Sequence, residues 1–231
     1  MGRRAKTAPE NRMNGTAPIA PFAAVPPEAV SPPLLRLDLG CGPNKQTGFV
    51  GVDCLGFPGV DVILNLGAET WPWPNNSVAE VYSSHFLEHL TQRERVHFAN
   101  ELYRVLVPGR YVDGALVEGF ARISTPHWCS ERAYGDPTHK WPPVTGWLYF
   151  YWNRDWRMGN PANPAFQNPQ APHTDIENNR DGYSCDFDWN LQGVFRPELT
   201  TRSEEYRRFA SENYKEAFTD LVAILISKKK Q

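Results

Sequence analysis

The stretch that decides the fold is LLRLDLGCGPNKQTGFVGVD, residues 34–53. It holds two short apolar runs, with Asp38 near the end of the first and Asp53 at the end of the second. Gly40 and Gly42 lie between the runs. Short runs rich in Val and Leu are typical of strands buried in a parallel sheet. The stretch therefore predicts an α/β fold with a ligand-binding turn at the carboxyl ends of its first two strands.

The glycines and acids also indicate the kind of ligand. Gly40 and Gly42 allow a close approach of the backbone at positive φ, and we expect their amide groups to face a polar or anionic part of the ligand. Asp53 is placed to accept hydrogen bonds from both hydroxyls of a ribose. A dinucleotide fingerprint needs a third glycine where this chain has Lys45. Asp38 would repel a pyrophosphate but suits an ammonium, so the pattern favours S-adenosylmethionine, which carries both an ammonium and an adenosine.

The link between these two strands is short. A parallel crossover normally takes about a dozen residues or more, and fewer separate the two apolar runs. We therefore expect the first helix of the fold to be reduced to a turn, with loop amides rather than a helix dipole meeting the ligand.

Further apolar runs predict the rest of a sheet. For the fifth strand we favour residues 121–126, with 111–120 as an inserted hairpin or loop. The expected strands are rich in Val, Leu, Ile and aromatic residues. They span 34–39, 48–53, 59–66, 78–86, 121–126, 187–195 and 218–228.

Two helices are expected from their starting residues and their periodicity. Thr91, with Glu94 three residues later, forms a capping box, and Pro108-Gly109 ends the apolar pattern that follows. The second helix spans 203–215, and its spacing turns Tyr206, Phe209 and Ala210 inward.

The composition divides the chain into an arm and a domain. Residues 1–33 are rich in Pro and Ala, which predicts a flexible arm. Residues 34–231 form the domain. Within it, 128–190 holds six of the eight tryptophans among Pro, Asn and Gly, and we interpret it as an irregular, aromatic-rich cap on the substrate side.

The chain resembles the class I S-adenosylmethionine-dependent methyltransferases, in particular the methyltransferase 11-like branch. The resemblance rests on LDLGCG at 37–42, WPWPNNSVAEVYSSHFLEHL at 71–90 and ELYRVLVPG at 101–109, and it covers roughly 34–127. It implies a Rossmann-like, mostly parallel seven-stranded sheet with flanking helices and an antiparallel last strand. It also implies methyl transfer with S-adenosylmethionine as the cofactor.

The resemblance further implies roles for single residues. Different residues are expected to bind the methionine end of the cofactor, its ribose and its adenine. One histidine is expected to face the transferable methyl group. These residues are Asp38, Gly40, Cys41 and Gly42 at the methionine end, Asp53 at the ribose, Asn65 and Leu66 beside the adenine, and His85 at the methyl.

Besides the short link between its first two strands, the chain departs from the family pattern in two places. Asn65 stands where an acid is often found near the adenine. Arg110 replaces the second glycine of the usual Pro-Gly-Gly, and extra residues precede RISTPH at 122–127.

Candidate catalytic residues follow the fourth strand and lie in the cap. Alignment of acceptor and methyl supplies much of the acceleration, and a base is needed only when the acceptor must lose a proton. Asp136 and His139 flank a Pro turn, and with His85 they are our catalytic candidates. An Asp–His pair suits a general base, and a side-chain cap of the turn is the alternative. We expect Glu88 and His89 to order the turn in which they lie.

No metal is expected from the sequence. His127, Cys129, His139 and Cys185 include the residue types of a zinc site, but their spacing fits no short zinc pattern.

The acceptor is the least determined part of the prediction. We expect a small or medium-sized acceptor, either a metabolite or a modified nucleotide, because aromatic side chains stack on flat ligands. A nucleic acid is an alternative that the net charge of -2 does not indicate. Residues 83–86 read SSHF, so the Asn/Asp-Pro-Pro-aromatic clamp of many base amino-methyltransferases is absent there, and NPAF at 163–166 comes after the fifth strand. A catalytically silent cofactor- or partner-binding protein is a further alternative.

The expected compartment is the cytoplasm. The sequence shows no signal-peptide pattern and no apolar run long enough to span a membrane, and we expect no membrane partner. The four cysteines form no close pair, which favours free thiols. The oligomeric state stays undetermined.

Overall fold

The computed structural model describes residues 33–159 and 182–230. The chain divides into two units, Met1–Pro33 and Leu34–Gln231, and almost all of the first lies outside the described residues. The predicted flexible arm at 1–33 and the NPAF sequence at 163–166 therefore fall outside the described residues. The predicted cap at 128–190 is described only in part.

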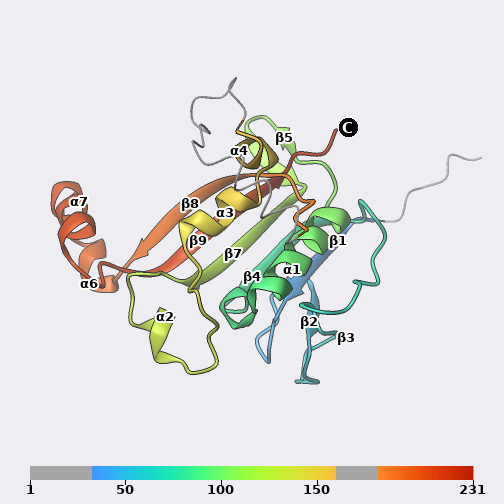
Figure 1. Cartoon of the computed structure of the whole chain (residues 1–231), viewed down its shortest axis with the longest axis horizontal. Coiled ribbons are helices and arrows are strands. Elements are labelled where there is room, and N and C mark those ends of the chain that lie inside the picture. Colours follow the sequence, from blue (N-terminus) through green and yellow to red (C-terminus); the bar gives the residue numbers. More distant parts are fainter. Residues whose placement is uncertain (1–32, 160–181, 231) are drawn as a thin grey trace, which may run out of the picture. The chain divides into compact units, whose positions relative to one another are not determined.

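The second unit is built on a seven-stranded sheet with the order β3-β2-β1-β4-β7-β9-β8. Six strands run parallel, and β9 pairs antiparallel with both β7 and β8 (Figure 1). This confirms the predicted sheet with its antiparallel last strand. The strands are β1 Leu35–Leu39, β2 Val50–Asp53, β3 Val62–Ile63, β4 Val78–Ser84, β7 Phe120–Pro126, β8 Phe187–Phe195 and β9 Phe218–Ser227.

The link from β1 to β2 contains no helix, as its length predicts. The third strand is shorter than predicted, because only Val62–Ile63 of the apolar run 59–66 pairs with β2. It is one of the two edge strands of this sheet, and Ile63 is 68% exposed. An apolar run alone does not show how many of its residues find a neighbouring strand.

Helix α1, Gln92–Val105, begins with the predicted capping box. The Thr91 backbone amide donates to Glu94 Oε2 at 2.7 Å, and the Glu94 amide donates to Thr91 Oγ1 at 3.5 Å. Two amide groups that the helix itself cannot satisfy thus find partners. Phe98 and Leu102 on its inner face are completely buried.

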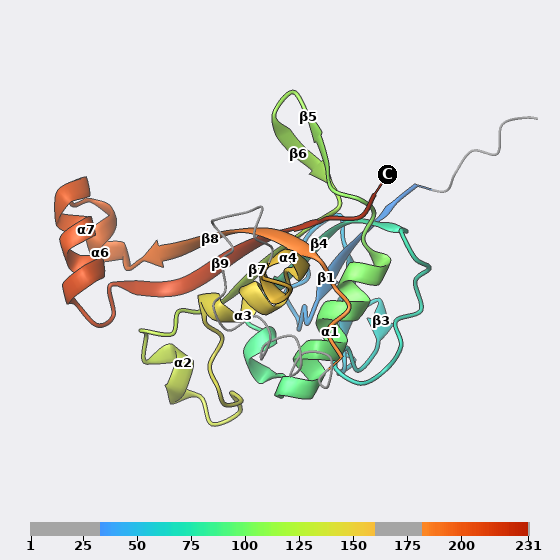
Figure 2. The ribbon, with the colours of Figure 1, turned by 45° about the horizontal axis from the view of Figure 1, so that its top comes forward.

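Helices α1, α3 (Gly146–Tyr151) and α4 (Arg154–Arg157) lie on one face of the sheet (Figures 1 and 2). The rings of Phe98 and Trp152 lie 6.5 Å apart, which joins this layer into one core. Tyr149, Trp152 and Trp156 are buried, so several aromatic residues of the predicted cap serve the core. On the opposite face, alternate side chains of β8 are exposed, and the described residues leave that face open there.

The fifth-strand prediction is confirmed. Residues 121–126 lie within β7, and the residues before it form a separate hairpin of β5, Arg110–Val112, and β6, Ala115–Glu118. The hairpin stands away from the main sheet (Figure 2).

The second predicted helix is α7, Glu204–Asn213, and its inward face is only partly as expected. Ala210 is buried, but Tyr206 and Phe209 are 40% and 49% exposed. With the short α6, Pro197–Thr200, this helix lies beyond the far ends of β8 and β9 (Figures 1 and 2). Little of the core reaches that place, so the two aromatic rings pack against Tyr214 instead.

Candidate functional site

The glycine loop lies at the carboxyl ends of β1 and β2, next to the end of β4. Gly40 has a φ of 69°, and a Cβ at this position would overlap the ring of Phe86. Phe86 lies two residues after the end of β4. Its contact with Gly40 therefore packs the segment after β4 against the loop. Glycine at position 40 is required by the close approach as well as by the positive φ.

The loop amides are used inside the protein. The amide groups of Gly40 and Cys41 donate to the Val52 carbonyl at 2.8 and 3.2 Å, and the Gly42 amide donates to Asp53 Oδ2 at 2.9 Å. The expectation that the Gly40 and Gly42 amides face the ligand is therefore wrong. Because no helix follows the loop, these amides hold the loop on β2 instead.

Asp38 is a buried acid at the end of β1, with 2% of its surface exposed. Its Oδ2 accepts a hydrogen bond from the Gln46 amide at 2.7 Å. Burial raises the pKa of Asp38 above its ordinary value, and the Gln46 amide and the charge of Lys45 oppose this only in part. A cationic group at this carboxylate would favour its charged form.

Lys45 stands where a dinucleotide fingerprint would have its third glycine, and here its side chain has a structural role. Its ammonium pairs with Asp61 Oδ2 at 2.8 Å, and the same oxygen accepts the Gly51 amide at 2.7 Å. The Lys45 side chain lies over Gly51, where a Cβ would come within 2.6 Å of it. Lys45 thus fastens the loop to β2. Sequence reasoning missed Asp61, and its signal was a Gly within β2 that makes room for a long side chain.

Asp53, at the end of β2, is fixed by two backbone donors. Its Oδ2 accepts from Gly42, and its Oδ1 accepts from the Leu55 amide at 3.0 Å. It is only partly buried, so both oxygens are oriented at a surface that a ligand can reach.

The two residues expected beside an adenine differ in exposure. Asn65 is exposed, and its Oδ1 accepts from the Gly67 amide at 3.1 Å. Leu66 is 2% exposed and belongs to the core, where its carbonyl accepts from the Trp71 indole at 3.2 Å. The structure therefore does not bring the Leu66 side chain to the site, because the chain turns inward after Asn65.

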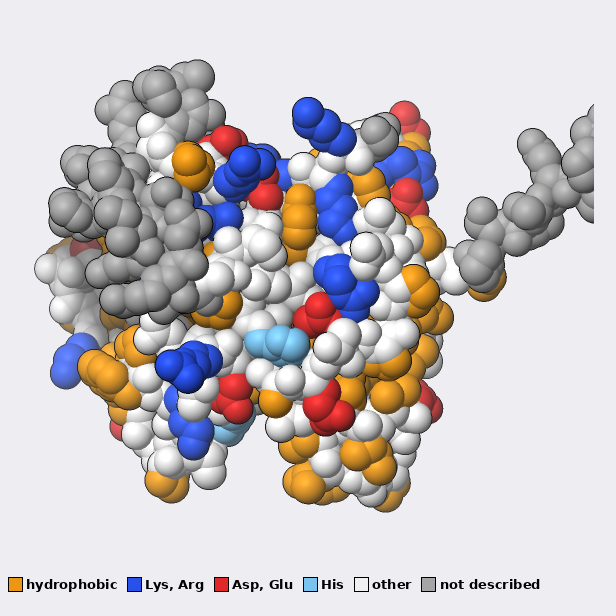
Figure 3. All heavy atoms as spheres, turned by 45° about the vertical axis from the view of Figure 1, so that its right-hand side comes forward, with side chains coloured by type: hydrophobic (Ala, Val, Ile, Leu, Met, Phe, Trp, Pro, Cys, Tyr) orange, Lys and Arg blue, Asp and Glu red, His pale blue; other side chains and the backbone are white. Residues whose placement is uncertain are grey.

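His85 follows β4 and lies between two acids. Its backbone has a φ of 54°, and its amide donates to the Ser124 carbonyl at 2.8 Å. Its Nδ1 lies 3.2 Å from Glu88 Oε1, and its Nε2 lies 3.5 Å from Asp220 Oδ1. The side chain is 37% exposed. The face of the molecule in Figure 3 carries basic, acidic and hydrophobic side chains side by side, and its lower edge is notched.

Asp136 and His139 do not form a hydrogen-bonded pair. Asp136 Oδ1 accepts from the amide and the hydroxyl of Thr138, at 2.8 and 2.6 Å, and these bonds lower the pKa of Asp136. Asp136 Oδ2 lies 3.8 Å from His139 Nε2. Of the two interpretations, the structure favours the side-chain cap for Asp136.

The four residues considered for zinc do not assemble. Cys129 is exposed, whereas Cys185 is completely buried and its thiol points to the Trp152 carbonyl at 3.7 Å. His127 is buried against Trp128 and Phe218, and burial lowers its pKa to about 4. Among residues 33–159 and 182–230, these side chains form no ligand group.

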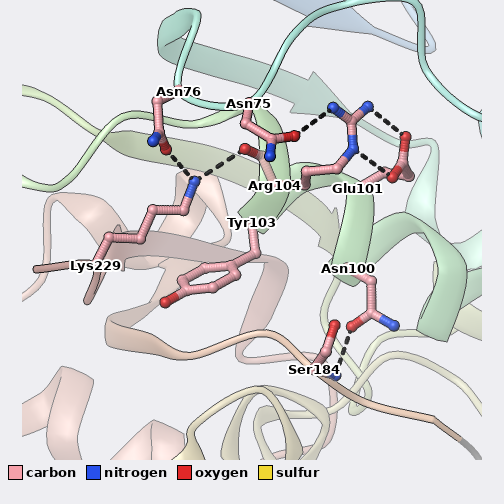
Figure 4. Close-up of a pocket in the computed structure, with 8 residues that line it drawn as sticks. All are labelled: Asn75, Asn76, Asn100, Glu101, Tyr103, Arg104, Ser184 and Lys229. Carbon is pink, nitrogen blue, oxygen red and sulfur yellow. Dashed lines mark hydrogen bonds and ion pairs between the residues drawn. The ribbon is translucent and has the colours of Figure 1, made fainter.

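A hollow of about 390 Å³ lies at the opposite, amino end of the sheet (Figure 4). Arg104 there pairs with Glu101 at 2.7 Å and donates to the Trp71 and Trp73 carbonyls. Lys229 donates to Asn76 Oδ1 and to the Arg104 and Leu106 carbonyls. Because these groups satisfy one another, the hollow joins the end of the chain to α1 rather than presenting free ligands.

A second hollow, of about 460 Å³, lies beyond the carboxyl end of β7. Its walls come from the segment after β7, from β8 and β9, and from the end of α7. They include His127, Trp128, Tyr214 and Phe218. Several of its walls are aromatic rings. Like the glycine loop, the hollow is reached from the carboxyl ends of the parallel strands.

Comparisons with known proteins agree with the strand order. No family model and no curated protein matches the chain. An S-adenosylmethionine-dependent methyltransferase structure from Archaeoglobus fulgidus is 20% identical, covers 84% of this chain and 86% of its own, and gives a TM-score of 0.51. The chain has the class I methyltransferase fold.

Two further solved structures are similar to the chain. One is a putative methyltransferase in complex with the Haloferax volcanii Trm112 activator, at 12% identity, 85% and 83% coverage, and a TM-score of 0.46. The other is an S-adenosylmethionine-dependent methyltransferase from Mesorhizobium loti, at 16% identity, 84% and 90% coverage, and a TM-score of 0.42. No described helix of this chain is long and apolar enough to cross a membrane.

Proposed function

We propose that this protein transfers a methyl group from S-adenosylmethionine to a small or medium-sized acceptor. The observation that carries the proposal is a pair of separately held carboxylates on either side of the glycine loop. Asp38 is buried and has a raised pKa, and Asp53 is partly exposed with both oxygens oriented. A cofactor with an ammonium at one end and a ribose further along matches this pair.

We assign each of three residues to a different part of the cofactor. Asp38 binds the ammonium, which offsets the burial of its carboxylate. Asp53 accepts from the ribose hydroxyls, and the exposed Asn65 lies beside the adenine. The space next to Gly42 is open, since a Cβ there would have no neighbour within 4 Å, and it leaves room for the cofactor along the loop. Bound S-adenosylmethionine supplies an electrophilic methyl group on its sulfonium.

His85 is proposed to lie beside the transferable methyl. The residue that follows it, Phe86, packs on Gly40, so His85 is held at the glycine loop. Its contacts with Glu88 and Asp220 fix the ring. We assign to it the positioning of the acceptor against the methyl group.

The acceptor is proposed to occupy the aromatic hollow beyond β7. Trp128 and Phe218 offer ring faces, and His127 is neutral near pH 7 because burial lowers its pKa to about 4. A flat, weakly charged metabolite, or the base of a modified nucleotide, suits such walls. Methylation of a nucleic acid stays an alternative, as does a silent protein that only binds the cofactor.

The cofactor assignment is tested by calorimetry with S-adenosylmethionine and S-adenosylhomocysteine, with NAD as the comparison. We expect the wild type to bind the first two and not NAD. Asp53→Asn should weaken binding about ten- to a hundredfold, because a charged hydrogen bond contributes about 1.5–3 kcal/mol. Asp38→Asn should weaken S-adenosylmethionine binding similarly while the protein stays folded, since it removes a buried charge.

Asp113→Asn is the matched control. Asp113 lies in the turn of the β5–β6 hairpin at a φ of 50°, a conformation that Asn accepts readily, and we expect unchanged affinity. Undiminished binding in both site variants would overturn the assignment.

The acceptor is sought with methyl-labelled cofactor. Metabolite, nucleotide and RNA or DNA pools are each incubated with the protein, and the labelled product is isolated. Label in a small molecule supports the proposal, and label in polymeric nucleic acid supports the alternative. Cofactor binding without label in any pool would favour the silent protein.

A further inference from the structure

Three side chains with metal-binding atoms meet beside the proposed methyl-transfer site. Glu88 and His89 belong to η1, Leu87–His89, and His139 lies in the loop after α2, Arg132–Gly135. One ligand atom of each lies within 4.8 Å of the other two. The two imidazole rings are 4.8 Å apart and nearly perpendicular. His139 comes 50 residues after His89 in the sequence. The cluster therefore forms no short motif that the sequence could show.

The hydrogen bond of His139 shows which of its two ring nitrogens can bind a metal ion. Its Nδ1 lies 3.3 Å from the Ala133 carbonyl. A carbonyl only accepts hydrogen bonds, so Nδ1 carries the proton of the neutral ring. Nε2 keeps its lone pair and makes no hydrogen bond with Asp136, whose Oδ2 lies 3.8 Å away.

The same conclusion holds for His89. Its Nδ1 lies 3.0 Å from Thr138 Oγ1, and the Thr138 hydroxyl donates to Asp136 Oδ1 at 2.6 Å. Because the hydroxyl hydrogen is used on Asp136, the oxygen accepts from His89 Nδ1. The Nε2 lone pair of His89 is therefore free as well. Histidines that bind metals usually donate their other nitrogen to a carbonyl or a similar acceptor in this way.

Glu88 supplies an independent observation. It is 3% exposed, and its Oε1 is paired with His85. Its Oε2 is buried and has no hydrogen-bond partner in the part of the chain that the structure describes. A buried carboxylate oxygen without a hydrogen-bond partner is costly. The charge of Arg95 offsets part of that cost, and a bound cation would offset more of it.

The cluster is held together before any ligand arrives. The Lys140 amide donates to the Glu88 carbonyl at 2.8 Å. The buried guanidinium of Arg95 donates to the Pro142 and Lys140 carbonyls at 2.8 and 3.3 Å. These bonds fix the loop that carries His139 against η1 and α1.

We propose that Glu88, His89 and His139 bind a divalent first-row transition-metal ion such as Zn²⁺. Two imidazoles and one carboxylate form a donor set that such ions prefer, and Ca²⁺ or Mg²⁺ would select oxygen ligands instead. Three protein ligands leave a coordination position for water or an acceptor oxygen. Asp136 acts as a positioning residue, since it sets the tautomer of His89 through Thr138. This revises the prediction from sequence that no metal is bound.

The test uses the full chain, stripped of metal with a chelator and titrated with Co²⁺ in place of Zn²⁺. Co²⁺ bound by nitrogen and oxygen ligands has visible absorption bands, and Zn²⁺ should displace it. We expect His89→Gln, His139→Gln and Glu88→Gln each to weaken Co²⁺ binding by about a hundredfold or more and to change the spectrum. Asp136→Asn should weaken it by about tenfold while the spectrum keeps its shape, as outer partners do.

His97→Gln is the matched control. His97 lies on α1 and bonds to the Glu69 carbonyl at 2.7 Å, outside the cluster. It should bind Co²⁺ as the wild type does. Circular dichroism and thermal melting of each metal-free variant verify that it is folded. Failure of the wild type to bind Co²⁺ or Zn²⁺, or equal binding by the cluster variants and His97→Gln, would overturn the proposal. These readouts do not depend on methyl transfer, so the two proposals fail separately.

Discussion

Both ends of the sheet carry dense polar clusters. The two clusters differ in whether their polar atoms find partners within the protein. At the amino end, Lys229 and Arg104 donate to protein acceptors on every side (Figure 4). At the carboxyl end, Glu88 Oε2 has no hydrogen-bond partner within the described residues, and Asp38 is buried with a raised pKa. A cluster that satisfies itself stabilises the fold, whereas one that does not is stabilised by a ligand.

The largest effect should come from Gly40→Ala at the carboxyl end. The new Cβ would meet both a positive φ and the Phe86 ring, and we expect a loss of about 3 kcal/mol in the free energy of unfolding. Chemical denaturation measures it. Cofactor binding should also be lost, because the loop and the segment after β4 move apart.

Gly42→Ala separates the two causes. Gly42 has a φ of 52°, but a Cβ there would lie in open space. We expect a loss of only about 1–2 kcal/mol, from the backbone alone. Equal losses for the two variants would show that Phe86 does not press on the loop.

Next in size is Arg104→Met at the amino end. It removes the donors to Glu101 and to the Trp71 and Trp73 carbonyls, and we expect a loss of about 2 kcal/mol in stability. The affinity for S-adenosylmethionine should not change. Arg93→Met, at an exposed position of the same helix, should alter stability by less than about 0.5 kcal/mol. Weakened cofactor binding in Arg104→Met would break the distinction between the two ends.

The last prediction concerns the pH dependence of stability, and it depends on His127. Burial lowers its pKa from 6.5 to about 4, and its Nδ1 accepts the Cys129 amide at 3.2 Å, which requires the unprotonated nitrogen. Between these two pKa values the unfolded chain binds the extra proton and the folded chain does not. Stability is therefore complete above pH 6.5 and falls by up to about 3 kcal/mol as the pH drops toward 4.

His127→Gln sharpens this prediction. The variant keeps an acceptor but cannot titrate, so its stability should fall less over the same range, as measured by denaturation at a series of pH values. Identical pH dependence in the two proteins would assign the effect to other groups.

Local patterns were enough for most of the fold. The capping box of Thr91 and Glu94 and the apolar run of β7 depend on residues a few positions apart, and both appear as predicted. The inward turn of Tyr206 and Phe209 did not appear. Helical spacing shows which residues share a face, but only the packing of other elements decides whether that face is covered.

The candidate site was only partly accessible to such reasoning. Asp38 and Asp53 lie where the alternation of strands and turns placed them. The direction of the Gly42 amide and the burial of Leu66 differed from expectation, because each depends on a hydrogen bond or a core contact across the sheet.

By itself, the sequence determined where most strands lie along the chain, the glycine turn and its two acids, since these follow from residue type and local spacing. Only the tertiary structure decided which distant groups meet: Lys45 with Asp61, Phe86 with Gly40, and His139 with Glu88 and His89. Contacts of this kind leave no period in the chain. They depend on how strands and loops pack in space, where burial and unsatisfied lone pairs decide what an acid or a histidine can bind.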